Sequence, residues 1–166
     1  HPIVAHPPCQ RWGRFWSADG RYGIPGMDEG CFDAALTALI RYGGVIEHPQ
    51  DSLAWSEFCL PKPPRCGGWV ETQHSCTWTC RVEQGHYGHR ARKATWLLYK
   101  GDIPPSDLVW EPSEPKIKPR PGRDPIRERR IGAVQRMCKR EREATPIPFR
   151  DLLISLARNS RQARAA

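Results

Sequence analysis

Two short apolar runs with one amphipathic stretch between them constrain the fold of this chain more than any other feature of its sequence. The first run, residues 3–5, ends at a pair of prolines, and the second, residues 45–46, follows the glycine pair at 43–44. Between them, Asp28 is a predicted helix cap, and residues 32–40 carry apolar side chains at helical spacing. A strand, a helix and a second strand in this order are typical of an open parallel α/β sheet with a right-handed crossover.

We expect less regular structure than in a typical domain, because the chain contains 17 prolines and 14 glycines. Two later runs of strand-forming residues, 77–82 and 94–99, predict two further strands. The segment 101–124 is rich in proline and polar residues, which predicts a linker or an extended wrap over the surface. Helices are predicted for residues 52–58, 126–143 and 148–158. We therefore expect a core at residues 1–100, a linker at 101–124 and basic helices at 125–166.

The chain is basic, and its charge is unevenly placed. The net charge is +8, from 26 Lys and Arg residues against 18 acidic residues, and most of the clustered arginine lies between residues 116 and 142. Arginine binds phosphate through two parallel hydrogen bonds, so this region is a candidate DNA contact. A solvated basic tail or an exposed helix with internal salt bridges fits the same composition. The candidates for contact with DNA phosphates are Arg127, Arg130, Arg136, Lys139 and Arg140.

The seven cysteines form neither a disulfide framework nor a standard zinc pattern. Their number is odd and the first residues show no secretory signal, so we expect reduced thiols and a cytoplasmic location. Ordinary packing is the expected role of the Cys and His residues between positions 59 and 89, because paired Cys-x-x-Cys spacing is absent. A metal site that joins Cys76 and Cys80 to nearby histidines is the alternative. No apolar stretch reaches the length needed to span a bilayer.

Reactive side chains follow both of the predicted parallel strands. Pro7-Pro8-Cys9-Gln10 comes directly after the first strand, and Glu47-His48-Pro49 continues the second. The carboxyl ends of parallel strands lie at one edge of a sheet, where open α/β folds build their sites. A thiol and a carboxylate at this edge suit nucleophilic and acid–base chemistry. The sequence therefore predicts that Cys9 and Glu47 share one site.

The order of these motifs resembles that of the cytosine-C5 DNA methyltransferases. Pro-Pro-Cys-Gln at residues 7–10 resembles the catalytic motif of the family, Glu47-His48-Pro49 resembles its Glu-Asn element, and residues 88–93 resemble its Gln-x-Arg-x-Arg motif. The chain is similar in particular to compact methyltransferase-like proteins of bacteriophages, which would place it in a bacterial host cell. The resemblance implies an α/β fold, a shortened Rossmann-like methyltransferase sheet with a basic C-terminal helical appendage.

The chemistry of the family implies a role for each matching residue. Cys9 would add to C6 of a cytosine extruded from the DNA helix, and Glu47 would hydrogen-bond or protonate N3. Arg90 or Arg92 would hold the carboxylate or the developing charge, and C5 would take a methyl group from S-adenosylmethionine. The loop at residues 11–22 either closes over the DNA or packs its tryptophans on the core. Residues expected to contact the substrate are Pro8, Gln10, Arg11, Arg14, His48 and His89.

Three departures from the family pattern shape the expected function. His48 replaces the usual asparagine, the arginine motif lacks its leading glutamine, and no segment matches the Phe-x-Gly-x-Gly element that binds S-adenosylmethionine. We therefore expect a DNA cytosine-C5 methyltransferase-like enzyme of a restriction-modification type, whose cofactor site is completed elsewhere, for example by a second subunit. One alternative is a non-catalytic DNA-binding remnant with an anti-restriction or regulatory role. Another is a related modification of cytosine C5 that needs a partner subunit.

Overall fold

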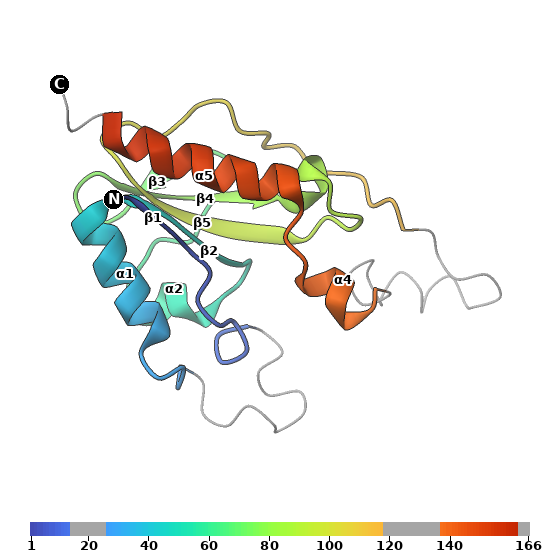
Figure 1. Cartoon of the computed structure of the whole chain (residues 1–166), viewed down its shortest axis with the longest axis horizontal. Helices are drawn as coiled ribbons and strands as arrows, with labels where there is room; N and C mark the ends of the chain where they lie inside the picture. Colours follow the sequence, from blue (N-terminus) through green and yellow to red (C-terminus); the bar gives the residue numbers. More distant parts are fainter. Residues whose placement is uncertain (14–25, 118–136, 163–166) are drawn as a thin grey trace.

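The computed structural model describes residues 1–13, 26–117 and 137–162 and places them in three layers, with helices on both faces of a sheet (Figure 1). The strands are β1 (Ile3–Ala5), β2 (Gly44–Pro49), β3 (Trp69–Glu71), β4 (Thr77–Glu83) and β5 (Ala94–Lys100). The helices are α1 (Cys31–Tyr42), α2 (Leu53–Glu57), α4 (Lys139–Glu143) and α5 (Ile147–Gln162), with a 3-10 helix, η1, at Gln84–Tyr87. Helices α1 and α2 cover one face of the sheet, and α5 covers the other.

The five strands form one mixed sheet in the order β1-β2-β5-β4-β3. β1 and β2 are parallel, with Ile3 opposite Gly44 and Ala5 opposite Ile46. The other three pairs are antiparallel. The predicted unit of strand, helix and strand is therefore confirmed, and so is the α/β class. The sheet as a whole is mixed rather than parallel, because β5 runs antiparallel between β2 and β4.

Successive residues of the central strands face opposite sides of the sheet, and each side has its own core. Ile46 belongs to the core beneath α1 and α2, and Val45 belongs to the core beneath α5. The helices contribute Phe32, Leu36 and Leu39 from α1, Trp55 from α2, and Phe149, Leu153 and Leu156 from α5. Fully burying one such side chain stabilises a fold by about 1.5–3 kcal/mol. The same alternation places Glu47 on the α5 side of β2 and His48 on the α1 side.

The boundaries of α1 are set by residues that the sequence identifies. The carboxylate of Asp28 accepts a hydrogen bond from the backbone N–H of Phe32 at 2.9 Å, which satisfies a free amide at the start of the helix. The helix ends at Gly43, where φ is 74°. Gly44 then approaches β1 so closely that a β-carbon would lie 2.0 Å from the carbonyl oxygen of Ile3. Only glycine fits where β1 and β2 begin their pairing.

The segment from residue 101 to 117 has no helix or strand and lies along the surface as an extended wrap. Several contacts anchor it to the sheet and the neighbouring turns. Leu108 is 6% exposed and packs into the core beneath α5. The backbone N–H and the hydroxyl of Ser113 donate to Oε2 of the buried Glu83 at 2.7 and 2.9 Å. Of the two predicted alternatives for this segment, the wrap is therefore the one that the described residues adopt.

The prediction of one continuous helix at residues 126–143 is wrong in the part of that range that the structure describes. Residues 137–138 are not helical, and α4 begins only at Lys139. Cys138 is extended, with φ −66° and ψ 162°, and its backbone N–H donates to Oε2 of Glu141 at 3.2 Å. This capping arrangement starts a new helix instead of continuing one. Residues 126–136 lie outside the described part of the chain.

Two smaller differences concern β3 and α5. The sequence pattern does not predict β3, because three residues are too few to show an alternation and they follow directly on a glycine pair. The last predicted helix, at residues 148–158, is confirmed as α5, which is longer at both ends. Within the described ranges, no helix is both long enough and apolar enough to cross a membrane.

Candidate functional site

The loop that follows β1 presents Cys9 at the edge of the sheet. The carbonyl oxygen of Cys9 accepts hydrogen bonds from the backbone N–H groups of Trp12 and Gly13 at 3.1 and 2.8 Å, which closes a tight turn. Trp12 is 4% exposed, and its indole N–H donates to Oδ2 of Asp28 at 2.7 Å. This tryptophan packs on the core, as one of the two alternatives for the loop predicts. The turn is thus fastened to the start of α1, while Cys9 stays exposed.

Glu47 lies on β2, and both of its carboxylate oxygens have partners. Oε2 lies 2.9 Å from Nδ1 of His6, which follows β1. Oε1 accepts a hydrogen bond of 3.1 Å from Nε2 of Gln84, the first residue of η1. The Glu47 side chain is 14% exposed, so it is largely enclosed but not sealed. The carboxylate is therefore held in one orientation by residues from two other parts of the chain.

The orientation of the Gln84 amide follows from the hydrogen bonds behind it. The hydroxyl of Thr95 donates to the carbonyl oxygen of Lys93 at 3.1 Å. Its oxygen is therefore free to accept from Nε2 of Gln84, which lies 3.0 Å away. The amide oxygen of Gln84 is buried without a hydrogen-bond partner among the described residues. An N–H group, and not an oxygen, thus faces Oε1 of Glu47.

The Cys9 thiol shares its electrostatic environment with Glu47 and Lys93. Although Cys9 is exposed as a residue, partial desolvation of its thiol raises its pKa above the usual value, and the negative charge of Glu47 raises the pKa further. The positive charge of Lys93 acts in the opposite direction. The free site therefore holds Cys9 as a thiol, and removing the negative charge of Glu47 favours its ionisation.

Lys93 links this site to the C-terminal helices. Its Nζ donates a 3.0 Å hydrogen bond to the carbonyl oxygen of Ala144, the residue directly after α4. Desolvation lowers the pKa of Lys93, whereas the charge of Glu47 and that of Cys9 in its ionised form oppose this effect. Glu143 at the end of α4 also acts electrostatically on both Cys9 and Lys93. The connection between α4 and α5 therefore closes one side of the site.

The expected substrate contact at His48 is not supported by its position. The imidazole is 0% exposed, and its ring centroid lies 5.4 Å from that of Phe32, edge to face. Its Nδ1 pairs with the hydroxyl of Ser52 at 2.7 Å. Burial lowers the pKa of His48 to about 4, while Glu47 and the carbonyl groups of Pro7-Pro8 act in the opposite direction. His48 therefore supports, from inside the core, the backbone that leads to Cys9.

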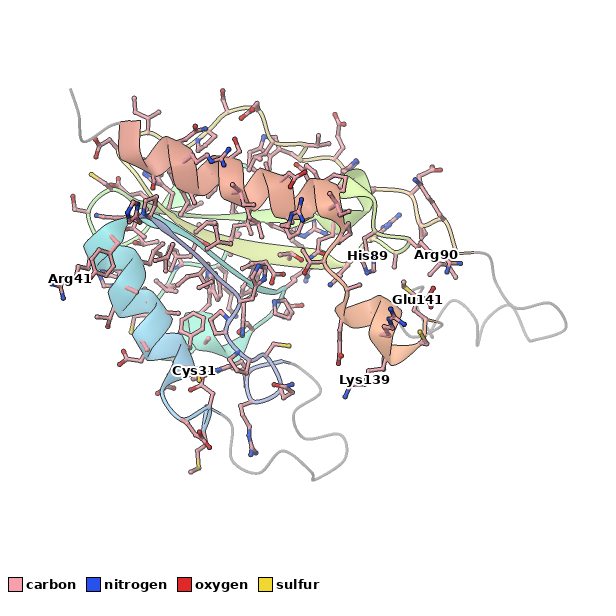
Figure 2. The ribbon with its side chains drawn as sticks, viewed as in Figure 1. Cys31, Arg41, His89, Arg90, Lys139 and Glu141 are labelled. Atoms are coloured by element: carbon pink, nitrogen blue, oxygen red, sulfur yellow. The ribbon has the colours of Figure 1, made fainter. Side chains whose placement is uncertain are left out.

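The expected contacts between the arginines and Glu47 are also not found. Nη1 of Arg90 donates to Oε1 of Glu141 on α4 at 2.6 Å, and Figure 2 shows the two side chains on the α4 side of the molecule. Arg92 is exposed, and only its backbone has a described contact, with the N–H of Gly85. The cation that the 88–93 motif places near Glu47 is Lys93.

The other candidate residues have varied surroundings. His89 is 4% exposed, and its Nδ1 accepts from the backbone N–H of Ala91 at 3.1 Å, so this ring shapes the turn before β5 and does not face a substrate. Pro8 and Gln10 are exposed beside Cys9, and Arg11 is half-buried. Lys139 and Arg140 are exposed on α4. Arg14, Arg127, Arg130 and Arg136 lie outside the described residues.

The structure adds three residues to the site whose roles the sequence motifs do not indicate, namely His6, Gln84 and Lys93. His6 and Lys93 lie within or beside the motifs at residues 7–10 and 88–93, so their positions are visible in the sequence but their roles are not. Gln84 follows the strand β4, far from both motifs in sequence. Only the pairing of β4 with β5, and of β5 with β2, brings it to Glu47.

S-adenosylmethionine, which the resemblance implies, does not fit the described residues by themselves. A nucleotide-type cofactor is usually held by a glycine-rich turn between a strand and a helix. β1 leads instead into the proline turn at residues 7–8, and β2 leads to Ser52, whose hydroxyl is taken by the N–H of Ala54 at 3.2 Å. In the same described ranges, no group of three or more His, Cys, Asp or Glu side chains is placed to hold a metal.

Comparison with known proteins gives no match. No family model, no curated protein and no solved structure matches this chain. The function is therefore inferred from its residues and their geometry.

Proposed function

We propose that this chain forms the cytosine-activating part of a DNA cytosine-C5 methyltransferase, with Cys9 as nucleophile and Glu47 as proton donor. The observation that carries the proposal is an exposed thiol in the loop after β1 that interacts electrostatically with an anchored carboxylate on the adjacent parallel strand β2. The two groups are close enough for Glu47 to raise the pKa of Cys9. The order of the sequence motifs supports the same chemistry independently.

The chemistry requires both groups, because C5 of cytosine is a weak nucleophile. The Cys9 thiolate forms a bond to C6, the displaced electron pair moves through the ring to N3, and N3 takes a proton from Glu47. C5 then has the electron density to bond an electrophile. Loss of the original C5 hydrogen as a proton, together with departure of the Cys9 sulfur, restores the aromatic ring. A protonated Glu47 carries no charge, so it also removes one cause of the raised Cys9 pKa.

Exposed basic side chains beside the site support DNA as the substrate. Arg90 and Arg92 lie in the turn before β5, and Lys139 and Arg140 lie on α4, which the Lys93–Ala144 hydrogen bond holds near the site. Side chains of this kind bind phosphates and position a duplex without reading its sequence. A target cytosine must leave its base stack before Cys9 can reach C6.

The methyl donor in this proposal is S-adenosylmethionine, held by a second subunit or by residues outside the described ranges. β1 is an edge strand of the described sheet, and Val4 on it is 39% exposed. Edge strands offer backbone groups that can pair with a further strand. This edge lies beside Cys9 and is the place where we expect a cofactor-binding segment to join.

Exchange of the C5 hydrogen tests the proposal without any methyl donor. When Cys9 adds to C6, C5 can take a proton from water, and elimination then releases the original hydrogen. Duplex DNA with tritium at cytosine C5 should therefore lose tritium to water in the presence of the protein. We expect release with the wild type and with Cys66→Ser, a second exposed cysteine, but none with Cys9→Ser. Equal release with Cys9→Ser would overturn the proposal.

The rival function is a non-catalytic DNA-binding protein, and the protonated state of the free Cys9 thiol favours it. Such a protein would release no tritium, yet it would bind DNA with a strong salt dependence that Cys9→Ser leaves unchanged. Transfer of label from S-adenosylmethionine to DNA, measured with and without host-cell extract, then shows whether a missing subunit restores activity.

A further inference from the structure

The two carboxylate oxygens of Glu47 are not equivalent. Oε1 faces an N–H group of Gln84, and the hydrogen bonds of Thr95 keep that amide from turning over. A hydrogen bond from a fixed N–H group makes an oxygen the less favourable place for a proton. A proton on Glu47 is therefore favoured on Oε2, on the side of His6.

His6 is placed to exchange that proton. Its Nδ1 lies 2.9 Å from Oε2, and its side chain is 41% exposed, whereas that of Glu47 is 14% exposed. Imidazole is the side chain that ordinarily gains and loses a proton near neutral pH. His6 is thus a group of the right chemistry between bulk water and the enclosed carboxylate.

We propose that His6 and Glu47 act as one proton-carrying pair, in which His6 is the positioning residue that keeps a proton available at Oε2 for the ring nitrogen of a bound cytosine. This inference rests on the function proposed above and assigns a role to a residue that the sequence motifs leave without one. One proton is shared between Nδ1 and Oε2 before reaction. As the sulfur–C6 bond forms, that proton moves from Oε2 to N3 and leaves a neutral imidazole beside an ionised carboxylate. When the adduct collapses, N3 returns the proton to Oε2 and Cys9 leaves as the thiolate. The proton that the Cys9 thiol gives up before the attack and the proton that leaves C5 both pass to water, so the pair itself ends the cycle with the proton that it began with.

The pair also affects the nucleophile. A pair that holds its proton has no net charge, whereas the deprotonated pair carries the negative charge that opposes ionisation of Cys9. The state in which the pair holds its proton therefore does two things. It can give a proton to N3 of the cytosine, and it favours ionisation of the Cys9 thiol. The other titratable groups around it are Cys9 itself, Lys93 before β5, Glu143 at the end of α4 and the buried His48 on β2.

The position of the imidazole proton tests the pair without any catalytic activity. A neutral His6 that donates to Glu47 must carry its proton on Nδ1, the tautomer that an unconstrained imidazole favours less. Nitrogen-15 NMR of the histidine rings should show His6 in the Nδ1–H form in the wild type, and a shift to the Nε2–H form in Glu47→Ala. An unchanged tautomer in Glu47→Ala would refute the pair.

The pH dependence of tritium release tests the proton supply. His6→Asn keeps an N–H donor near the position of Nδ1 but has no proton to give. We expect its release rate to fall about tenfold or more at neutral pH, in line with the usual size of general acid–base effects, and its optimum to move to lower pH. His74→Asn, which changes a histidine in the loop between β3 and β4, should match the wild type in both respects.

The outcomes separate the two proposals. If the wild type releases no tritium, either alone or with host-cell extract, while the NMR tautomer responds to Glu47→Ala, the pair exists but both the methyltransferase function and the supply of a proton to cytosine are refuted. If tritium release depends on Cys9 but His6→Asn keeps the wild-type rate and pH profile, the function stands and the role of His6 is refuted.

Discussion

The amide nitrogen of Gln84 donates to Oε1 of Glu47 at 3.1 Å, although the two residues are 37 positions apart in the sequence. Gln84 follows β4, Glu47 lies on β2, and β5 runs between these strands. Thr95 on β5 bridges the distance, because its hydroxyl lies 3.0 Å from the same Gln84 nitrogen. The orientation of the candidate proton donor thus depends on the antiparallel half of the sheet as well as on the parallel pair that carries the sequence motifs.

Replacing this amide should separate reactivity from stability. Gln84→Met has nearly the same length, loses the hydrogen bonds to Glu47 and Thr95, and removes an amide oxygen that is buried without a described partner. Because these effects oppose each other, we expect the free energy of unfolding to change by about 1 kcal/mol or less. The rate of tritium release from cytosine C5 should fall about tenfold or more, since Oε1 is no longer fixed. Urea denaturation and the release assay provide the two values, and a parallel loss of both would contradict this separation.

The sequence identifies the main residues of the site but not the contacts that they make. Cys9 and Glu47 are identified because each follows or continues an apolar run that ends in a proline turn, and parallel pairing then brings them together. The role of Arg90 could not be read from its motif, because its actual partner, Glu141, lies 51 positions later on a helix whose start depends on a local cap. His48 looks like a polar site residue in sequence, but the alternation along β2 turns it into the core. The contact between Gln84 and Glu47 depends in addition on the order of the strands, and the residue pattern of a mixed sheet does not reveal that order.

Substitution of Gly44 tests the close approach of β1 to β2. A β-carbon at this position would lie 2.0 Å from the carbonyl oxygen of Ile3, so Gly44→Ala must push the strands apart. We expect a loss of about 3 kcal/mol or more in the free energy of unfolding, typical of severe steric conflicts in a core. Gly68→Ala is the matched control, because Gly68 also has a positive φ, of 97°, but a β-carbon there would meet no atom within 4 Å. Its cost should be about 1–2 kcal/mol, from backbone conformation alone. Similar losses in the two variants, measured by urea denaturation, would show that the close contact is unimportant.

The pair formed by Arg90 and Glu141 gives opposite predictions for its two members. Both side chains are substantially exposed, with 58% and 40% of their surface accessible. If Arg90 also contacts a DNA phosphate, Arg90→Ala should weaken DNA binding and reduce the slope of log affinity against log salt by about one. Glu141→Ala frees the same guanidinium from its carboxylate and should strengthen binding. Fluorescence anisotropy across a salt series measures both effects. Weaker binding in both variants would instead indicate that the ion pair holds α4 in place for DNA.

The buried imidazole of His48 should make the stability of the protein depend on pH. Its pKa is lowered from 6.5 to about 4 by burial, so the folded protein holds it neutral where an unfolded chain would protonate it. Nδ1 already pairs with Ser52. The carbonyl groups of Pro7-Pro8 and the charge of Glu47 favour the imidazolium, but the cost of burying its charge outweighs them. The unfolded chain therefore binds more protons between pH 6.5 and 4, and the contribution of His48 is complete above pH 6.5 and is lost as the pH falls toward 4. The shift corresponds to about 3 kcal/mol across this window.

His48→Gln, which can still pair with Ser52, should be less stable than the wild type at pH 7 but show a shallower loss of stability on acidification. The difference between the two urea-denaturation curves at each pH reports on the histidine, and parallel curves would mean that His48 is protonated in the fold.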